Sequence, residues 1–145
     1  MCTGNKEVII SRSETETENA GSRLARNLAA GSIVLLRGDL GAGKTVFSRG
    51  FARGLGVTEV VSSPTYTIVQ EYELPGGGRL YHLDLYRIPG VDAALAFGVD
   101  EFLDDPRGIA LVEWPDRIEG ILSRNAVNVR LEHLSDSERR ITICR

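Results

Sequence analysis

One eight-residue stretch constrains the fold more than any other part of the chain. It is GDLGAGKT, residues 38–45, and it matches the P-loop spacing G-x-x-x-x-G-K-T. An apolar run at residues 33–36 precedes it, and a helical pattern begins at Lys44. A strand, a glycine-rich loop and a helix in this order allow backbone N–H groups to surround a phosphate chain, with the helix N-terminus directed at it. The stretch therefore predicts a site for the phosphates of a nucleotide.

The residues of this loop have different expected roles. Lys44 is expected to reach the β- and γ-phosphates, and the hydroxyl of Thr45 is expected to bind Mg²⁺. ATP is the expected nucleotide, because the guanine-reading motif Asn-Lys-x-Asp does not occur in the chain. The predicted nucleotide-binding residues are Gly38, Asp39, Leu40, Gly41, Ala42, Gly43, Lys44, Thr45 and Val46.

Two carboxylates are candidates for binding the metal and orienting the attacking water. Asp84 follows the apolar segment 80–83, and Glu113 follows the apolar segment 109–112. Catalytic carboxylates of P-loop enzymes lie at the carboxyl ends of strands beside the loop, so we expect both residues in the site. Carboxylates that merely close a strand would give the same pattern. His82 shares a strand face with Asp84, and we expect a structural role for this lone strand histidine.

Strands and helices alternate through much of the chain. Segments 6–11, 33–36 and 108–114 have the apolar character of strands. A capping box at Ser13 to Glu16 begins a first helix that Gly31 ends, and the second helix follows the loop. Residues 92–103 predict one further short helical segment.

Two antiparallel hairpins complete the predicted sheet. One joins segments 65–74 and 79–86 through PGGG, and the other joins 125–134 and 139–145 through SDSE. The order of elements predicts an α/β fold, a P-loop NTPase-like domain of three layers spanning residues 1–145. Its central sheet is expected to be mixed and mainly parallel, with antiparallel strands at the edges.

Composition narrows the class of protein. The chain has 145 residues, of which 42% are hydrophobic and 26% charged, so a self-sufficient core is expected. No apolar run approaches the ~20 residues of a membrane span, so we expect no membrane partner. No secretory signal is visible, so we expect a cytoplasmic protein. The net charge of −3 argues against a broad basic nucleic-acid face. We expect the C-terminal Arg139, Arg140 and Arg145 to form a solvated charged edge strand, with an edge that faces a partner or tRNA as the alternative. The two cysteines lack metal-site spacing and are expected to be reduced thiols.

Four segments, in this order, resemble the TsaE family: GDLGAGKTVFSRGFARGLG, SSPTYTIVQEY, YHLDLYR and LVEWPDR. The resemblance extends over about residues 13–117. It implies an ATPase, with ATP and Mg²⁺ as cofactors, that is required for the N6-threonylcarbamoyladenosine (t6A) modification of tRNA. It also implies action on a complex of the TsaB and TsaD proteins, so tRNA is expected to be contacted only indirectly or within that assembly. No arginine finger is identifiable, and hydrolysis is expected to be slow in the isolated chain.

The same resemblance implies roles for individual residues. Thr65 resembles the switch-like threonine near the γ-phosphate, Asp84 the catalytic or Walker B aspartate, and Trp114 the required tryptophan beside the metal-associated Glu113. From sequence alone, Thr65 is equally compatible with a turn after Pro64, and Trp114 with packing. The predicted catalytic residues are Lys44, Thr65, Asp84, Glu113 and Trp114, and the predicted metal ligands are Thr45 and Glu113.

Two other functions stay open at this level. In a nucleotide-gated binding module, ATP would order the segment around Thr65 and set the affinity for a partner, with hydrolysis only resetting the state. A small-molecule kinase would transfer the phosphate to a metabolite, but only Arg87 and Arg107 lie between the two carboxylates as candidates for a lid arginine.

Overall fold

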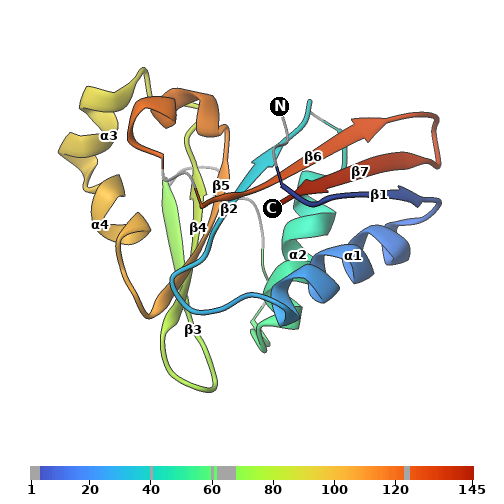
Figure 1. Ribbon diagram of the computed structural model, residues 1–145, viewed down its shortest axis with the longest axis horizontal. Coiled ribbons are helices and arrows are strands. Elements are labelled where there is room, and N and C mark those ends of the chain that lie inside the picture. Colours follow the sequence, from blue (N-terminus) through green and yellow to red (C-terminus); the bar gives the residue numbers. More distant parts are fainter. Residues whose placement is uncertain (1–3, 40, 60, 62–67, 123–124) are drawn as a thin grey trace.

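A mixed β-sheet with helices on both faces organises the protein (Figure 1). The computed structural model describes residues 4–39, 41–59, 61, 68–122 and 125–145. Within these residues the sheet has seven strands in the order β1-β7-β6-β2-β5-β4-β3. The strands are β1 Lys6–Ser11, β2 Ile33–Arg37, β3 Val69–Glu73, β4 Arg79–Asp84, β5 Gly108–Glu113, β6 Val127–His133 and β7 Arg139–Cys144.

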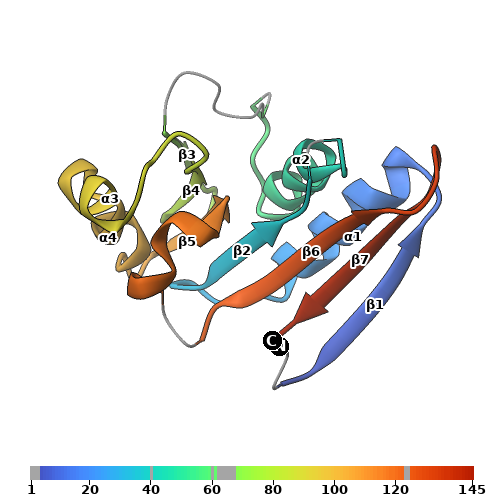
Figure 2. The ribbon, with the colours of Figure 1, turned by 90° about the horizontal axis from the view of Figure 1, so that it is seen from above.

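The helices form an outer layer on each side of this sheet, as Figures 1 and 2 show. Helices α1 and α2 cover one face, and α3 and α4 lie on the other, so the expected three-layer α/β architecture is confirmed. The bounds are α1 Glu14–Arg26, α2 Lys44–Gly54, α3 Val91–Phe97 and α4 Val99–Leu103, and a 3₁₀ helix, η1, spans Pro115–Ile121.

The centre of the sheet is parallel, and its edges are antiparallel, as expected. Strand β2 pairs in parallel with β5 on one side and β6 on the other, and β4 pairs in parallel with β5. Strand β1 pairs with β7, β7 with β6, and β3 with β4 in antiparallel fashion. Since the carboxyl ends of parallel strands meet at one edge, this order brings the ends of β2, β4 and β5 together.

Two local expectations need correction, and one element was not predicted. The single helical segment expected at 92–103 is two helices, because Gly98 takes the left-handed conformation (φ 93°) and interrupts it. The helix η1 was not predicted. Cys144 is disulfide-bonded rather than a reduced thiol. Because β1 pairs with β7, Cys144 lies opposite Lys6, at the other end of the chain. The sequence pattern does not show that the two ends of the chain meet.

Buried side chains form a core on each face of the sheet. Phe47 and Phe51 of α2 pack beneath α1 with Leu24, whereas Leu83 and Val112 face α3, α4 and η1. All six residues of β5 are buried, which matches a central parallel strand covered on both faces. In the ranges that the structure describes, no helix has the length and apolar character needed to cross a membrane.

A tyrosine–carboxylate hydrogen bond links β4 to the turn before β5. The buried Tyr81 hydroxyl donates to Asp105 Oδ2 at 2.5 Å. This bond is the main cause that raises the pKa of Tyr81 to about 12, and it also lowers the pKa of Asp105. The stabilisation is therefore complete between the ordinary pKa values of the two groups, about 4 and about 10. It is lost as the pH rises through about 12, and as the pH falls through the lowered pKa of Asp105.

We expect Tyr81→Phe to lower Tm at pH 7, because it removes a hydrogen bond to an ionised acceptor. The difference in Tm from the wild type should shrink below about pH 4 and above about pH 10. Thermal unfolding across this pH range measures it. Tyr72→Phe is the matched control, because the Tyr72 hydroxyl donates to the neutral Gln70 Oε1 at 2.6 Å. A Tyr81→Phe difference that persists unchanged in acid would contradict the assignment of Asp105.

Candidate functional site

The glycine-rich loop connects the end of β2 to the start of α2. Its backbone makes a close approach at Gly38, where an added Cβ would lie 2.7 Å from the carbonyl oxygen of Leu131. Gly43 precedes the first residue of α2 in the left-handed conformation, with φ at 101°. A side chain at either position would strain the path of the loop, since L residues rarely adopt positive φ. The glycines thus set the turn that leads into the N-terminus of α2.

Lys44, the first residue of α2, is buried, and its ammonium is engaged by the loop itself. Its Nζ donates to the carbonyl oxygen of Gly38 at 2.6 Å. The same Nζ lies 4.3 Å from the centroid of the Trp114 ring, within range of a cation–π interaction. An ammonium has three N–H donors, so the bond to Gly38 leaves donors with which the lysine can bind a phosphate oxygen.

Trp114 has an unusual backbone conformation beside this lysine. It has φ 59° and ψ 51°, and among the described residues it is the one non-glycine with positive φ. This conformation costs of order 1–3 kcal/mol and is often found at functional sites. The Trp114 ring lies 4.9 Å from that of the exposed Tyr86, centroid to centroid, and it also packs against the core on this face of the sheet.

Both candidate carboxylates lie at the adjacent carboxyl ends of β4 and β5. Asp84 and Glu113 are opposite each other in the register of these strands. Burial raises the pKa of Asp84, and the Glu113 carboxylate acts in the same direction, while the N–H of Tyr86, 3.1 Å from Asp84 Oδ1, lowers it. Glu113 is only 3% exposed, and its Oε2 lies 2.6 Å from His82 Nε2.

A cavity of about 540 Å³ joins these groups. From the predicted set, it is lined by Gly41, Gly43, Lys44, Thr45, Val46, Asp84, Glu113 and Trp114. Gly38, Asp39 and Ala42 instead line a second cavity of about 570 Å³, which Lys44 and Trp114 also border. Leu40 and Thr65 lie outside the described residues. The predicted residues are thus divided between two cavities, which both border Lys44 and Trp114, and their roles stay a prediction.

The oxygen groups in the first cavity are of the kind that Mg²⁺ prefers. The Thr45 hydroxyl and the Asp84 and Glu113 carboxylates are hard oxygen ligands. Among the described residues, no group of three or more His, Cys, Asp or Glu side chains is arranged to hold a metal. A Mg²⁺ ion bound with a nucleotide does not need one, because it uses one or two carboxylates, waters and phosphate oxygens. The donor set therefore fits the ion.

Comparison with known proteins extends this picture to the whole chain. Residues 11–141 match the family model described as "Threonylcarbamoyl adenosine biosynthesis protein TsaE". The chain belongs to the TsaE family. It is 42% identical over 127 residues to the tRNA threonylcarbamoyladenosine biosynthesis protein TsaE of Bacillus subtilis, covering 88% of this chain and 78% of that protein. The TsaE protein of Treponema pallidum is 37% identical over 92% of this chain and 97% of its own.

The fold comparison agrees with the sequence comparison. The crystal structure of YdiB from Bacillus subtilis superposes with a TM-score of 0.81 at 35% identity, covering 96% of this chain and 84% of that one. The TsaE match also extends beyond the predicted 13–117, to residue 141. It therefore includes the turn between β6 and β7, which borders the cavity.

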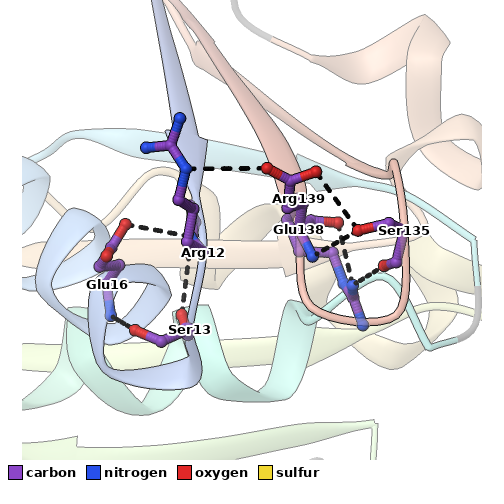
Figure 3. A network of polar contacts seen from close by, with 7 residues as sticks. Arg12, Ser13, Glu16, Ser135, Glu138 and Arg139 are labelled. Atoms are coloured by element: carbon purple, nitrogen blue, oxygen red, sulfur yellow. Dashed lines mark hydrogen bonds and ion pairs between the residues drawn. The ribbon is translucent and has the colours of Figure 1, made fainter.

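Two walls of the cavity were not among the predicted site residues, although Thr17 is a weak sequence candidate for a nucleotide contact that helix capping explains equally. They are the start of α1 and the β6–β7 turn, which contribute Arg12, Ser13, Glu14, Thr17, Asp136, Ser137 and Arg139. Figure 3 shows how polar contacts organise them: Ser13 Oγ accepts from the Glu16 N–H, and Arg12 Nε lies 3.7 Å from Glu138 Oε2. The capping box predicted a helix start, but no local signal placed it beside the P-loop.

Arg139 was expected at a solvated edge but lies in this site. Its Nη1 donates to the carbonyl oxygens of Ser135 and Glu138, at 2.9 and 3.0 Å. Its Nη2 donates to the carbonyl oxygen of Gly41 at 3.3 Å. The guanidinium thus connects the β6–β7 turn to the P-loop, and with Arg12 and Lys44 it is one of three basic groups, among the described residues, that line the cavity of this TsaE family protein.

Proposed function

We propose that this protein is a Mg²⁺-dependent ATPase required for the t6A modification of tRNA, and that it acts on a complex of TsaB and TsaD. The observation that carries the proposal is the grouping of Lys44, Thr45, Asp84 and Glu113 around one cavity at the N-terminus of α2. This grouping supplies groups that can bind phosphate oxygens, together with carboxylates, in the arrangement that phosphoryl transfer needs. The curated TsaE relatives are named for threonylcarbamoyladenosine biosynthesis, and this supports the tRNA pathway.

The cavity is large enough for more than the phosphates. It extends from the loop to the start of α1 and to the β6–β7 turn, where Thr17 and Arg139 border it. We infer that the phosphates of ATP lie on the loop and the N-terminus of α2, since the N–H groups there favour anions. The nucleoside then lies toward α1 and the β6–β7 turn.

Hydrolysis would depend on positioning and on electrostatic stabilisation. Lys44 would bind the β- and γ-phosphates through its ammonium, where it stabilises charge that develops in the transition state. Asp84 or Glu113 would orient the water for in-line attack, and the backbone N–H groups of the loop would hold the phosphates in line. Thr45 and Glu113 would hold Mg²⁺, which when bound neutralises part of the phosphate charge.

A nucleotide-gated binding module is a second candidate, and one observation favours it. Lys44 contacts the Gly38 carbonyl and the Trp114 ring, so the arrival of phosphate would change the surroundings of a half-exposed aromatic pair, Trp114 and Tyr86. A partner that touches Tyr86 would then distinguish the ATP-bound state from the free state. The gated module and the ATPase are compatible, because hydrolysis would reset the gate.

Phosphate release from ATP and Mg²⁺ by the purified chain tests the proposal, first alone and then with TsaB and TsaD. We expect slow release alone and faster release with the pair, because a partner is needed to complete the site. Tight ATP binding with no release in either mixture would instead support the gated module. Equal affinity for the partner with ATP, ADP and a nonhydrolysable analogue would exclude nucleotide gating. Phosphate found on an added metabolite would indicate a kinase.

A further inference from the structure

A buried histidine contacts the candidate carboxylate of β5 from beneath the cavity. His82, in β4, is 1% exposed, and its Nε2 lies 2.6 Å from Glu113 Oε2. Both side chains are almost fully buried, since Glu113 is itself only 3% exposed. A short contact between two buried polar side chains on neighbouring strands restricts the orientation of both.

The strand register explains why only this histidine can make the contact. Strands β4 and β5 are parallel, with Asp84 opposite Glu113 and His82 opposite Leu111. Alternate residues of a strand point to the same face, so His82 and Asp84 share the face on which Glu113 also lies. His82 therefore lies one step deeper in the sheet than Asp84. It reaches diagonally to Glu113, and it does not line the cavity.

The other ring nitrogen indicates which atom carries the hydrogen. His82 Nδ1 is buried and has no hydrogen-bond partner among the residues that the structure describes. An imidazolium would leave a buried, charged N–H without an acceptor, which costs more than an unfilled lone pair on a neutral ring. The neutral ring with its hydrogen on Nε2 satisfies the contact, so Nε2 donates and Glu113 Oε2 accepts.

We propose that His82 is a positioning residue for Glu113: its Nε2–H holds one carboxylate oxygen and so fixes the plane in which the other oxygen is presented to the cavity. The inference rests on the proposed ATPase, in which Glu113 binds Mg²⁺ or orients water. A carboxylate free to rotate would spend less time in the productive orientation, and it would lose the polarisation that the donated hydrogen bond supplies. His82 itself touches no substrate.

Two substitutions of similar size separate positioning from packing. The side-chain nitrogen of His82→Gln can occupy the place of Nε2, whereas His82→Asn is too short to reach Glu113. We expect His82→Asn to lower kcat by about 10- to 100-fold, with a smaller change in the KM for ATP, and we expect His82→Gln to recover most of the rate. The control for a histidine-to-asparagine substitution is His133→Asn, at the exposed last residue of β6.

A second readout does not depend on turnover. Trp114 is the single tryptophan of the chain and borders the cavity, so its fluorescence can follow ATP binding as Mg²⁺ is varied. We expect the Mg²⁺ concentration for half-maximal binding to rise about 10- to 100-fold in His82→Asn and much less in His82→Gln. Thermal unfolding of all variants identifies any that fail to fold.

The outcomes separate this inference from the proposed function. Equal losses in His82→Asn and His82→Gln, together with equal falls in Tm, would overturn positioning and leave only a packing role. A wild-type rate and Mg²⁺ requirement in His82→Asn would also overturn it. If the wild type binds ATP but releases no phosphate, the ATPase fails while the Mg²⁺ requirement of the two variants still decides the role of His82. A wild type that binds no ATP would defeat both.

Discussion

Lys44→Ala is expected to slow phosphate release by about 100- to 1000-fold, a loss of about 2.7 to 4 kcal/mol in transition-state stabilisation. The lysine is buried beside the loop, where a charge acts in a low-dielectric environment and is not replaced by water. ATP affinity should also fall, because the ammonium would bind the phosphates in the ground state. Steady-state kinetics with ATP and Mg²⁺ measure kcat and KM, and the fluorescence of Trp114 measures binding.

The chain offers a matched control for this experiment. It contains two lysines, and the other, Lys6, lies exposed at the start of β1. Lys6→Ala removes the same charge from the protein as a whole but not from the cavity, so it should leave kcat unchanged. Hydrolysis at the wild-type rate in Lys44→Ala would contradict the assignment of the lysine. Equal losses in the two variants would indicate a general effect of charge.

The positions of the residues nearest the P-loop were predictable because local patterns determine them. A glycine-rich loop between a buried strand and a helix has few other uses, and it located Lys44 and Thr45 directly. Asp84 and Glu113 followed from one topological rule, that the ends of parallel strands meet at one edge. The register of β4 and β5 confirms that the two carboxylates are neighbours. Their roles in catalysis stay a prediction.

The rest of the site depends on contacts between distant segments. Arg139 reaches the Gly41 carbonyl only because the predicted β6–β7 hairpin lies beside β2 in the sheet, a placement that the sequence pattern does not state. The diagonal contact of His82 with Glu113 needs the exact pairing of two strands that are 31 residues apart at this contact. The left-handed conformation of Trp114 is similarly hidden, because tryptophan rarely adopts it.

Glycines at the contact between α1 and α2 determine how α1, one wall of the cavity, lies relative to the P-loop. An added Cβ at Gly50 of α2 would lie 1.9 Å from the carbonyl oxygen of Glu18, and one at Gly21 of α1 would lie 2.3 Å from that of Phe47. The two helix backbones therefore approach more closely than any side chain allows. This approach also brings α1 to the loop, where a Cβ at Gly43 would lie 3.8 Å from Thr17 Cγ2.

Gly50→Ala is expected to reduce the free energy of unfolding by about 1 to 3 kcal/mol, or more if the helices cannot separate. Alanine improves helix propensity by roughly 0.5–1 kcal/mol, but the new methyl group meets rigid backbone of Glu18, so crowding is the larger effect. Denaturant unfolding of the variant measures the loss. Gly76→Ala, whose new Cβ would meet nothing within 4 Å, is the control and should be near neutral.

The same substitution tests whether fold and site are coupled. If Gly50→Ala moves α1 away from α2, Thr17 moves away from Gly43 and the nucleoside wall of the cavity opens. ATP binding should then weaken even in the folded fraction, while the Lys44 and Thr45 side chains stay in place on α2. A large loss of stability with unchanged ATP affinity would show that α1 is structural support only. Unchanged stability would show that the helix pair adapts, contrary to the close backbone contact.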